Sequence, residues 1–247
     1  MRELRLLHLY PDLMSLYGSY ANLAMLTRTL SALGHTVSVE PVALGAEVDF
    51  TDAALIFMGA GTERARTAAL EDARRFREAL FAAFEAGTPL LFVGTALELL
   101  GREIVTASGE SVPGLCLADF TVTEGKRRIV GDVLGETALY ADPVVGYMNK
   151  CTTLTGVHTP LLTRCALGFG NESEGDAEGW QEKNGFGSQL TGPLLVKNPA
   201  MLQAVAAALL TYKGLSLPKE WPVDPHAAAG YAVTAQELAR RCQKADT

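Results

Sequence analysis

The segment Thr88-Pro-Leu-Leu-Phe-Val-Gly-Thr-Ala-Leu-Glu-Leu-Leu-Gly101 predicts, in succession, a buried strand, a tight turn and the start of a helix. Residues 90–93 are all apolar, as expected for a strand of a parallel sheet that is covered on both faces. Gly94 permits the sharp turn that follows. In many α/β enzymes such a turn carries the nucleophile, and the amide groups after it stabilise negative charge. Because Gly94 has no side chain, the segment predicts either the backbone of a catalytic site that lacks its nucleophile or an ordinary strand-to-helix turn.

Strand and helix patterns alternate in the first half of the chain. The expected strands are Leu4–Leu9, Val37–Val42 and Ala54–Met58, and the expected helices are Ala21–Leu33 and Ala65–Ala86. The apolar positions of the long helix recur at helical spacing, and Gly87 ends it. This alternation predicts an α/β fold with a mostly parallel sheet flanked by helices.

The second half has shorter segments, separated by glycine, asparagine and aspartate, which predict additional antiparallel or mixed strands. The expected elements are strands at Phe120–Thr123, Arg128–Leu134, Val144–Tyr147 and Gly185–Leu190, a flexible loop at Gly170–Asn184, and helices at Pro199–Tyr212 and about Thr234–Gln243. Residues 1–213 are predicted to form one domain. Residues 214–247 are predicted to be an extension that packs on this domain or docks a partner.

Composition limits the function classes. The chain of 247 residues has a net charge of −7, which disfavours nonspecific nucleic-acid binding because phosphate contacts need a concentrated basic surface. Its apolar runs are too short for a membrane span, and its N-terminus lacks the pattern of a signal peptide. The cysteines form no C-x-x-C pair. The sequence therefore predicts a reduced cytoplasmic protein without a metal or cofactor.

Two further segments are candidates for a site. Gly59-Ala-Gly-Thr-Glu-Arg64 follows an apolar strand, so its small residues either bring backbone amides close to an anion or simply turn the chain. Gly187-Ser-Gln-Leu-Thr-Gly-Pro-Leu-Leu195 predicts a short strand that enters a Gly-Pro turn. Neither matches a phosphate-binding or dinucleotide-binding fingerprint.

Taken in order, these segments resemble the class I glutamine amidotransferase superfamily. Within it the resemblance is greatest to the cobyric-acid-synthase-like (CobB/CobQ-like) group, which includes GatD, the glutaminase subunit of bacterial lipid II isoglutaminyl synthase. The resemblance extends to about Tyr212 and implies a flavodoxin-like fold. The matching segments are Leu16-Tyr-Gly-Ser-Tyr-Ala-Asn22, Gly59-Ala-Gly-Thr-Glu-Arg64, Gly114-Leu-Cys-Leu-Ala-Asp-Phe120, Arg128-Ile-Val-Gly-Asp132, Gly146-Tyr-Met-Asn149 and Gly192-Pro-Leu-Leu-Val-Lys-Asn198.

The sequence departs from the family pattern at the positions of the catalytic residues. The resemblance aligns Gly94 with the catalytic cysteine, Thr191 with the catalytic histidine, Glu98 with a glutamine, and Ser19 with an early acidic residue. In an intact member the cysteine thiolate attacks the glutamine amide and the histidine moves protons. The resemblance therefore implies that this chain does not hydrolyse glutamine.

The remaining substrate-binding positions implied by the resemblance are Gly59, Ala60, Gly61, Thr95, Glu98 and Arg128. Arg128 either binds an anion near the substrate entrance or belongs to a solvated hairpin tip at Lys126–Arg128. The histidines and cysteines lie outside the aligned site positions, so a relocated Cys/His dyad is a minor alternative.

Several functions remain open at the level of sequence. The first is a noncatalytic partner or regulatory subunit of a Mur-ligase-like (MurT-type) synthetase in peptidoglycan amidation. The second is an enzyme that uses Thr95, Glu98, Thr191 and Arg128 for another reaction. The third is a sensor that binds glutamine or another small amino acid. A role in corrinoid (cobalamin) amidation is a further alternative.

Overall fold

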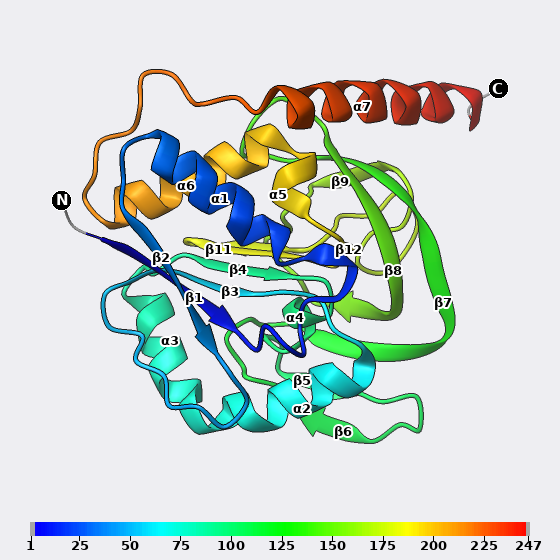
Figure 1. Ribbon diagram of the computed structural model, residues 1–247. Helices are drawn as coiled ribbons and strands as arrows, with labels where there is room; N and C mark the ends of the chain where they lie inside the picture. Colours follow the sequence, from blue (N-terminus) through cyan, green and yellow to red (C-terminus); the bar gives the residue numbers. More distant parts are fainter. Residues whose placement is uncertain (1–2, 246–247) are drawn as a thin grey trace.

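Six strands form the central sheet of the computed structural model, which describes residues 3–245 (Figure 1). Their spatial order is β10-β11-β4-β3-β1-β2. All neighbours are parallel except β10, which is antiparallel to β11. The strands are β1 (Leu4–Leu9), β2 (Val37–Val42), β3 (Ala53–Met58), β4 (Leu90–Val93), β10 (Trp180–Glu182) and β11 (Gly185–Ser188). The mostly parallel sheet expected from the sequence is confirmed.

The strand order reverses between β1 and β3. The chain leaves β1 through a helix to reach β2, whereas β3 lies on the other side of β1 and leads to β4. This is the flavodoxin-like order, in which the loops at the carboxyl ends of the strands beside the reversal form a crevice. The flavodoxin-like fold class is thus confirmed, and the loops after β1, β3 and β4 surround its expected binding edge.

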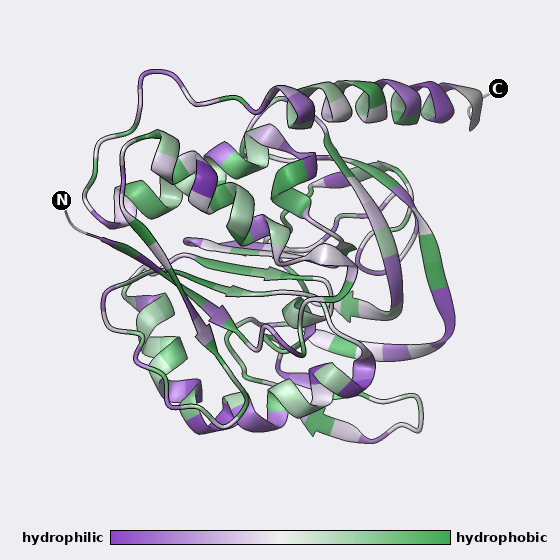
Figure 2. Cartoon of the chain, viewed as in Figure 1, coloured by the Kyte–Doolittle hydropathy of each residue, from purple (hydrophilic) through white to green (hydrophobic). Residues whose placement is uncertain are grey.

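Helices cover both faces of this sheet (Figure 1). The helical segments are η1 (Leu16–Gly18), α1 (Ala21–Ala32), α2 (Glu63–Ala73), η2 (Arg74–Phe76), α3 (Arg77–Glu85), α4 (Thr95–Glu98), α5 (Leu194–Lys197), α6 (Pro199–Tyr212) and α7 (Pro225–Ala245). Helices α1, α5 and α6 pack on one face, and α2 and α3 pack on the other. Figure 2 shows the central strands mostly in green, in keeping with the fully buried β3 and β4.

A second sheet has the order β12-β8-β7-β5-β6, and β9 also pairs with β7. Its strands are β5 (Glu103–Val105), β6 (Ser111–Pro113), β7 (Thr121–Glu136), β8 (Val144–Thr155), β9 (Arg164–Leu167) and β12 (Leu190–Thr191). The antiparallel hairpin of β7 and β8 dominates it. The additional antiparallel strands expected in the second half are confirmed.

The strands expected at Phe120–Thr123 and Arg128–Leu134 are one strand, β7. Its register breaks between Glu124 and Ile129, where residues 125–128 lie opposite the single residue 151. The expectation of a hairpin tip at Lys126–Arg128 is therefore wrong, because this basic run belongs to a bulge within a strand. The bulge directs Arg128 toward the start of α2, as described below.

The single helix expected at Ala65–Ala86 is also wrong, because a 3-10 turn at Arg74–Phe76 separates α2 from α3. Phe76 leaves the helical conformation, with φ −117° and ψ 17°. Its ring packs against Tyr10 and Phe50, with centroid distances of 6.3 and 5.4 Å, and only 6% of the residue is exposed. Burial of this aromatic ring outweighs the loss of regular helix geometry.

Two expectations around residues 170–190 need correction. The expected loop Gly170–Asn184 contains β10, because Trp180 is buried against Phe84 at a centroid distance of 5.6 Å. The expected strand Gly185–Leu190 is divided between β11 and β12, which belong to different sheets. The buried Glu178 carboxylate causes this division, since it accepts hydrogen bonds from Ser188 Oγ and Gln189 N.

The final helix, α7, begins at Pro225 rather than near Thr234. Asp224 accepts hydrogen bonds from the amides of His226 and Ala227, and proline is favoured in the first helical turn. Leu238 of α7 is buried against the second sheet. The helix therefore packs on the rest of the chain. Residues 1–2 and 246–247 lie outside the described residues, so the ends of the expected domain and extension are not described.

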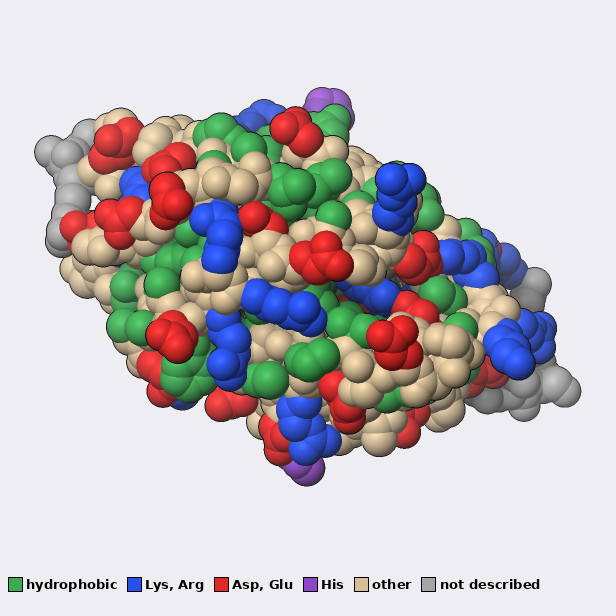
Figure 3. All heavy atoms as spheres, turned by 90° about the horizontal axis from the view of Figure 1, so that it is seen from below, with side chains coloured by type: hydrophobic (Ala, Val, Ile, Leu, Met, Phe, Trp, Pro, Cys, Tyr) green, Lys and Arg blue, Asp and Glu red, His purple; other side chains and the backbone are tan. Residues whose placement is uncertain are grey.

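Figure 3 shows the face formed by α2, α3, β5 and β6, where acidic and basic side chains are interspersed. No helix within residues 3–245 has the length and apolar character needed to cross a bilayer.

Candidate functional site

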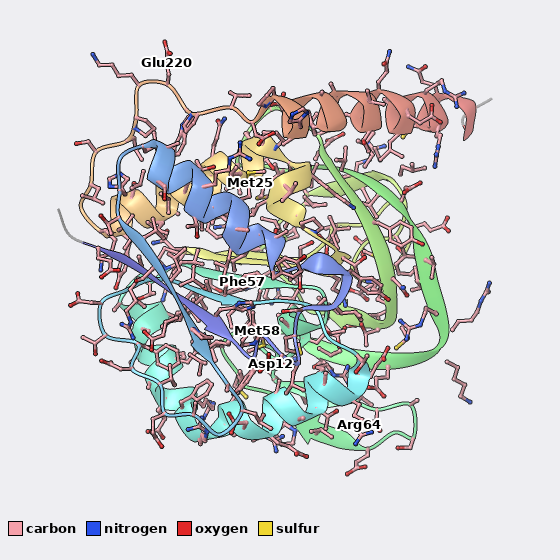
Figure 4. The ribbon with its side chains drawn as sticks, viewed as in Figure 1. Asp12, Met25, Phe57, Met58, Arg64 and Glu220 are labelled. Carbon is pink, nitrogen blue, oxygen red and sulfur yellow. The ribbon has the colours of Figure 1, made fainter. Side chains whose placement is uncertain are left out.

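Gly94 forms the sharp turn between β4 and the four-residue helix α4. Its backbone has φ 63° and ψ −136°, a conformation that residues other than glycine adopt only with strain. Gly94 N donates a 2.7 Å hydrogen bond to Ser188 O of the neighbouring strand. Figure 4 labels Met58, the last residue of β3, and Asp12, which lies in the segment that follows β1. The sequence-predicted turn thus lies at the carboxyl edge of the sheet, one strand away from the topological switch point between β1 and β3.

The loop after β3 lies directly on this turn. A Cβ atom at position 94 would be 2.5 Å from Ala60 Cβ and 3.1 Å from Ala60 Cα. Both separations are far below normal carbon–carbon contact distances. The space into which a side chain at position 94 would project is therefore occupied by Ala60.

The amides of the same loop are already hydrogen-bonded within the protein. Ala60 N donates to Ser19 Oγ at 3.1 Å, and Gly61 N donates to Thr95 Oγ1 at 2.9 Å. Thr95 Oγ1 in turn donates to Gly61 O at 3.0 Å. An oxyanion hole needs donors that are aimed at the reacting oxygen. In this chain the Ala60 and Gly61 amides are bound to Ser19 and Thr95, whose hydroxyl groups hold the loop in place.

Gly59 has a packing role in this arrangement. A Cβ atom there would lie 2.3 Å from both Ser19 Oγ and Met14 O. The close approach of the loop after β3 to the segment after β1 therefore requires glycine at this position.

Thr191 lies in β12, next to the Gly94 turn. Its hydroxyl group donates a 3.0 Å hydrogen bond to Tyr147 O, and only 8% of the residue is exposed. A threonine hydroxyl group is not a base at neutral pH, and no described histidine contacts it. Thr191 therefore links two strands.

Glu98 is buried within a charged cluster. Its Oε2 accepts a 2.5 Å hydrogen bond from Arg66 Nη1, and its Oε1 accepts bonds from Thr152 at 2.7 Å and Gln189 at 3.4 Å. Arg66 Nη2 also pairs with Glu124 at 2.5 Å. Burial alone would lower the pKa of Arg66, but these two carboxylates raise it. Arg66, Glu98 and Glu124 form an ion triad from three segments distant in sequence, in which Arg66 and Glu98 are buried and Glu124 is partly exposed.

A second pair of buried charges lies beside this triad. Lys150 Nζ donates to Gln189 Oε1 at 2.5 Å and to Gly170 O at 2.7 Å. Burial lowers the pKa of Lys150 to about 8, although Glu178 and Glu98 oppose the shift. Burial raises the pKa of Glu178 to about 7, although the Gln189 amide, Lys150 and Ser188 oppose it. These side chains fill the interior behind Gly94.

Arg128 lies at the mouth of the site. Its guanidinium group pairs with Glu63 at the start of α2 and donates a 3.1 Å hydrogen bond to Asn149 Oδ1. Asn149 Nδ2 donates to the Tyr17 hydroxyl group at 2.7 Å. The charge of Arg128 is thus balanced by Glu63, and the arginine braces the bulge of β7 against α2.

The space left among these groups is very small. A cavity of about 10 Å³ remains, lined by Tyr17, Ala60, Gly61, Gly94, Thr95, Glu98, Asn149, Lys150, Gln189 and Thr191. This is at the lower limit for a single water molecule. The structure therefore brings most of the sequence-predicted site residues together, but it leaves no room there for an amino acid. Ser19 and Gly59 lie behind the loop, and Arg128 lies outside the cavity.

The alternative of a relocated Cys/His dyad finds no support in the contacts. Within residues 3–245, no hydrogen bond joins a cysteine to a histidine. Burial raises the pKa of Cys151 to about 11, and Glu63, which accepts its thiol hydrogen bond at 3.4 Å, adds to the shift. A thiol with a raised pKa is a poor nucleophile. Nor do the described residues contain a cluster of three or more His, Cys, Asp or Glu side chains able to hold a metal ion.

Adding a methyl group at the turn is expected to test its steric closure. Gly94→Ala should lower the free energy of unfolding by about 1–3 kcal/mol, because the new Cβ would overlap Ala60. The double variant Ala60→Gly/Gly94→Ala should recover part of this loss. Urea unfolding of the three proteins measures the effect.

Gly109→Ala is the matched control, because Gly109 also has a positive φ but a Cβ there would meet no atom within 4 Å. It should lose less stability than Gly94→Ala. Equal losses at the two positions, with no recovery in the double variant, would contradict the steric closure.

Comparisons with known proteins agree with this architecture. Residues 5–199 match the model of the CobB/CobQ-like glutamine amidotransferase domain. The chain is 27% identical over 221 residues to the subunit GatD of lipid II isoglutaminyl synthase (glutamine-hydrolyzing) from Staphylococcus aureus, covering 89% of this chain and 90% of that protein. It is 28% identical over 240 residues to the corresponding Streptococcus pneumoniae subunit, covering 96% and 89%.

Two solved structures are more distant. A glutamine amidotransferase has 14% identity and a TM-score of 0.46, covering 85% of this chain and 99% of that one. The glutaminase domain of Trypanosoma brucei CTPS with bound acivicin has 12% identity and a TM-score of 0.48, covering 89% and 96%. Since the family model spans most of the sequence, the chain belongs to the CobB/CobQ-like glutamine amidotransferase family.

Proposed function

We propose that this chain is a pseudoenzyme of its family, a GatD-like subunit that does not hydrolyse glutamine and acts as the partner or regulatory subunit of a MurT-type ligase. One observation carries the proposal. The turn at Gly94 has no nucleophilic side chain, and the place for one is filled by Ala60 at 2.5 Å. Under this proposal, Gly94 and Thr191 stand at the positions of the family's cysteine and histidine.

The chemistry of amide hydrolysis supports the inactive part of the proposal. Formation of a thioester needs a thiolate, a group that moves protons and free donors for the oxyanion. In this chain the Ala60 and Gly61 amides bind Ser19 and Thr95, and the Thr191 hydroxyl group binds Tyr147 O. Loss of the nucleophile alone costs orders of magnitude in rate.

The names of the two relatives support a ligase as the partner of this chain. Both GatD proteins are named as subunits of lipid II isoglutaminyl synthase, and each aligns over most of its length. We therefore favour peptidoglycan amidation over corrinoid amidation. Ammonia would reach the ligase from solution or from another glutaminase.

The size of the residual cavity argues against the other functions considered for the old pocket. An amino-acid sensor or an enzyme that reuses the pocket needs room for its ligand, and ligand sites in proteins commonly have volumes of about 300–1,000 Å³. The volume among Gly61, Gly94 and Thr191 is about 10 Å³.

The inactive part is tested by measuring ammonia release from glutamine. The purified chain is assayed alone and with a MurT-type ligase, and a GatD protein that releases ammonia serves as the positive control. We expect no release above background in either sample. Ammonia release that is blocked by a glutamine analogue, together with covalent labelling of this chain by the analogue, would overturn this part.

The partner role is tested in a separate experiment. The tagged chain is coexpressed with the ligase, and the ligase is assayed for lipid II amidation with ammonium as the nitrogen donor. We expect a stable complex and faster ammonium-dependent amidation when the chain is present. If the two proteins do not associate and the ligase rate is unchanged, the partner role is wrong even if the chain is inactive.

A further inference from the structure

A second cavity lies away from the Gly94 turn, beneath α7. This α7 groove has a volume of about 690 Å³ and is bounded by α7, α1, α5 and the hairpin of β7 and β8. Figure 1 shows α7 starting above α5 and running over the upper ends of β8 and β7, and Figure 4 labels Met25 on α1. The volume is in the range that binds drug-sized molecules.

The walls of the α7 groove are largely apolar. Met25 from α1, Val196 from α5, and Ala227 and Tyr231 from α7 contribute to them. Tyr231 is fixed because its hydroxyl group donates a 2.8 Å hydrogen bond to Pro143 O. Such a lining favours a ligand with an apolar body, because burial of apolar surface drives binding.

The acidic side chains of the groove are neutralised by neighbours. Asp224 pairs with Arg28 at 2.8 Å, and its other oxygen accepts hydrogen bonds from the first amides of α7. Asp132 pairs with Arg241 at 2.6 Å. Neither acid presents an uncompensated negative charge to a ligand.

Lys197 differs from these acids. It is half-buried in the wall of the groove, and its side chain makes no hydrogen bond or ion pair with the side chains or backbone described for residues 3–243. The lysine therefore gives the groove an uncompensated positive charge beside apolar walls. A single anionic group on the ligand would complement it.

We propose that the α7 groove is a binding site for a small monoanionic amphiphile. The anionic group, a carboxylate or sulfonate, binds Lys197 Nζ, and the apolar body lies along Met25, Val196 and Tyr231. The α7 groove is separate from the small cavity at Gly94. The proposal therefore holds whether or not the chain hydrolyses glutamine.

The probe for the test is 8-anilinonaphthalene-1-sulfonate, which carries one negative charge on an aromatic body and fluoresces in apolar sites. Titration of the native chain should show saturable binding with one site per chain. Decanoate should displace the probe, whereas decylammonium at equal concentration should displace at least tenfold less. Equal displacement by the two, or the absence of saturable binding, would overturn the proposal.

Two variants test whether the probe binds in the α7 groove. Lys197→Gln should weaken binding about tenfold, which is the typical effect of losing a charge-assisted hydrogen bond. Gly230→Trp should abolish binding, since Gly230 lines the groove and a Cβ there would meet no atom within 4 Å.

Gly230→Ala is the matched control and should bind the probe like the original chain, because it adds only a methyl group. Circular dichroism verifies that each variant is folded. Unchanged affinity in both folded Lys197→Gln and folded Gly230→Trp would refute the site.

Discussion

Glu98→Ala is expected to lower the free energy of unfolding by about 3–5 kcal/mol, because removal of one partner of a buried ion pair leaves the other charge uncompensated. The side chains of Arg66 and Glu98 are only 3% and 2% exposed, and their ion-pair distance is 2.5 Å. The substitution also removes the acceptor of the hydrogen bond from Thr152. Urea unfolding at neutral pH measures the loss.

Glu124→Ala is the matched control for this prediction, since Glu124 pairs with the same arginine. Its side chain is 18% exposed, and Arg66 would keep its bond to Glu98 after the change. The control should therefore lose less than half as much stability as Glu98→Ala. Equal losses of stability in the two variants would contradict the larger effect expected from removing the more deeply buried carboxylate.

The contribution of Glu178 to the stability of the chain is expected to fall by about 2 kcal/mol as the pH rises from about 5 to about 7. Burial raises the pKa of this carboxyl group in the folded state to about 7, from the usual 4.5. Between these two values the folded state retains a proton that the unfolded state releases, so stability decreases with increasing pH. The contribution is fully present below the unfolded pKa and is lost through the folded pKa.

Lys150 does not contribute to the pH dependence of stability between about pH 5 and 7. Its pKa is lowered to about 8 in the folded state from 10.5, so both states are protonated below neutral pH. Its own contribution to stability is present above the unfolded pKa and is lost as the pH falls through about 8. His8 does titrate between about pH 5 and 7, because burial lowers its pKa in the folded state to about 4 from 6.5. Its contribution to stability therefore rises with pH and opposes that of Glu178. The Glu178 contribution is obtained from the difference between the original chain and a variant that lacks this carboxyl group.

Glu178→Gln removes this titrating group, so between about pH 5 and 7 its stability should rise relative to that of the original chain by about 2 kcal/mol. Glu182→Gln, at an exposed position of the same β10 region, should leave the pH dependence unchanged. Urea unfolding at a series of pH values between about 5 and 8 tests both variants. The same pH dependence of stability in Glu178→Gln and in the original chain would contradict this prediction.

The local elements around the site were predictable from the sequence because short-range signals specify them. The apolar run before Gly94 predicted β4 and the turn, and the glycine-rich run at Gly59–Gly61 predicted the neighbouring loop. Their order along the chain was sufficient to bring them together, because the carboxyl ends of parallel strands share one edge of the sheet.

The interior of the site was not predictable in the same way. Arg66, Lys150 and Gln189 lie in unrelated segments, and nothing in their local sequence distinguishes a buried charge from a solvated one. Likewise, the break at Phe76 depends on contacts with Tyr10 and Phe50, which are distant in sequence. The start of α7, in contrast, could be predicted, because Asp224-Pro225 is a capping signal in the local sequence.

The methyl group of Ala60 also constrains how this chain can evolve. A cysteine gained first at position 94 would overlap Ala60 Cβ at 2.5 Å, so it would reduce fitness through stability before any benefit from reactivity. Loss of the methyl group has to come first, and by itself it brings no catalytic gain. Placing a side chain at position 94 therefore needs two substitutions in a fixed order rather than one.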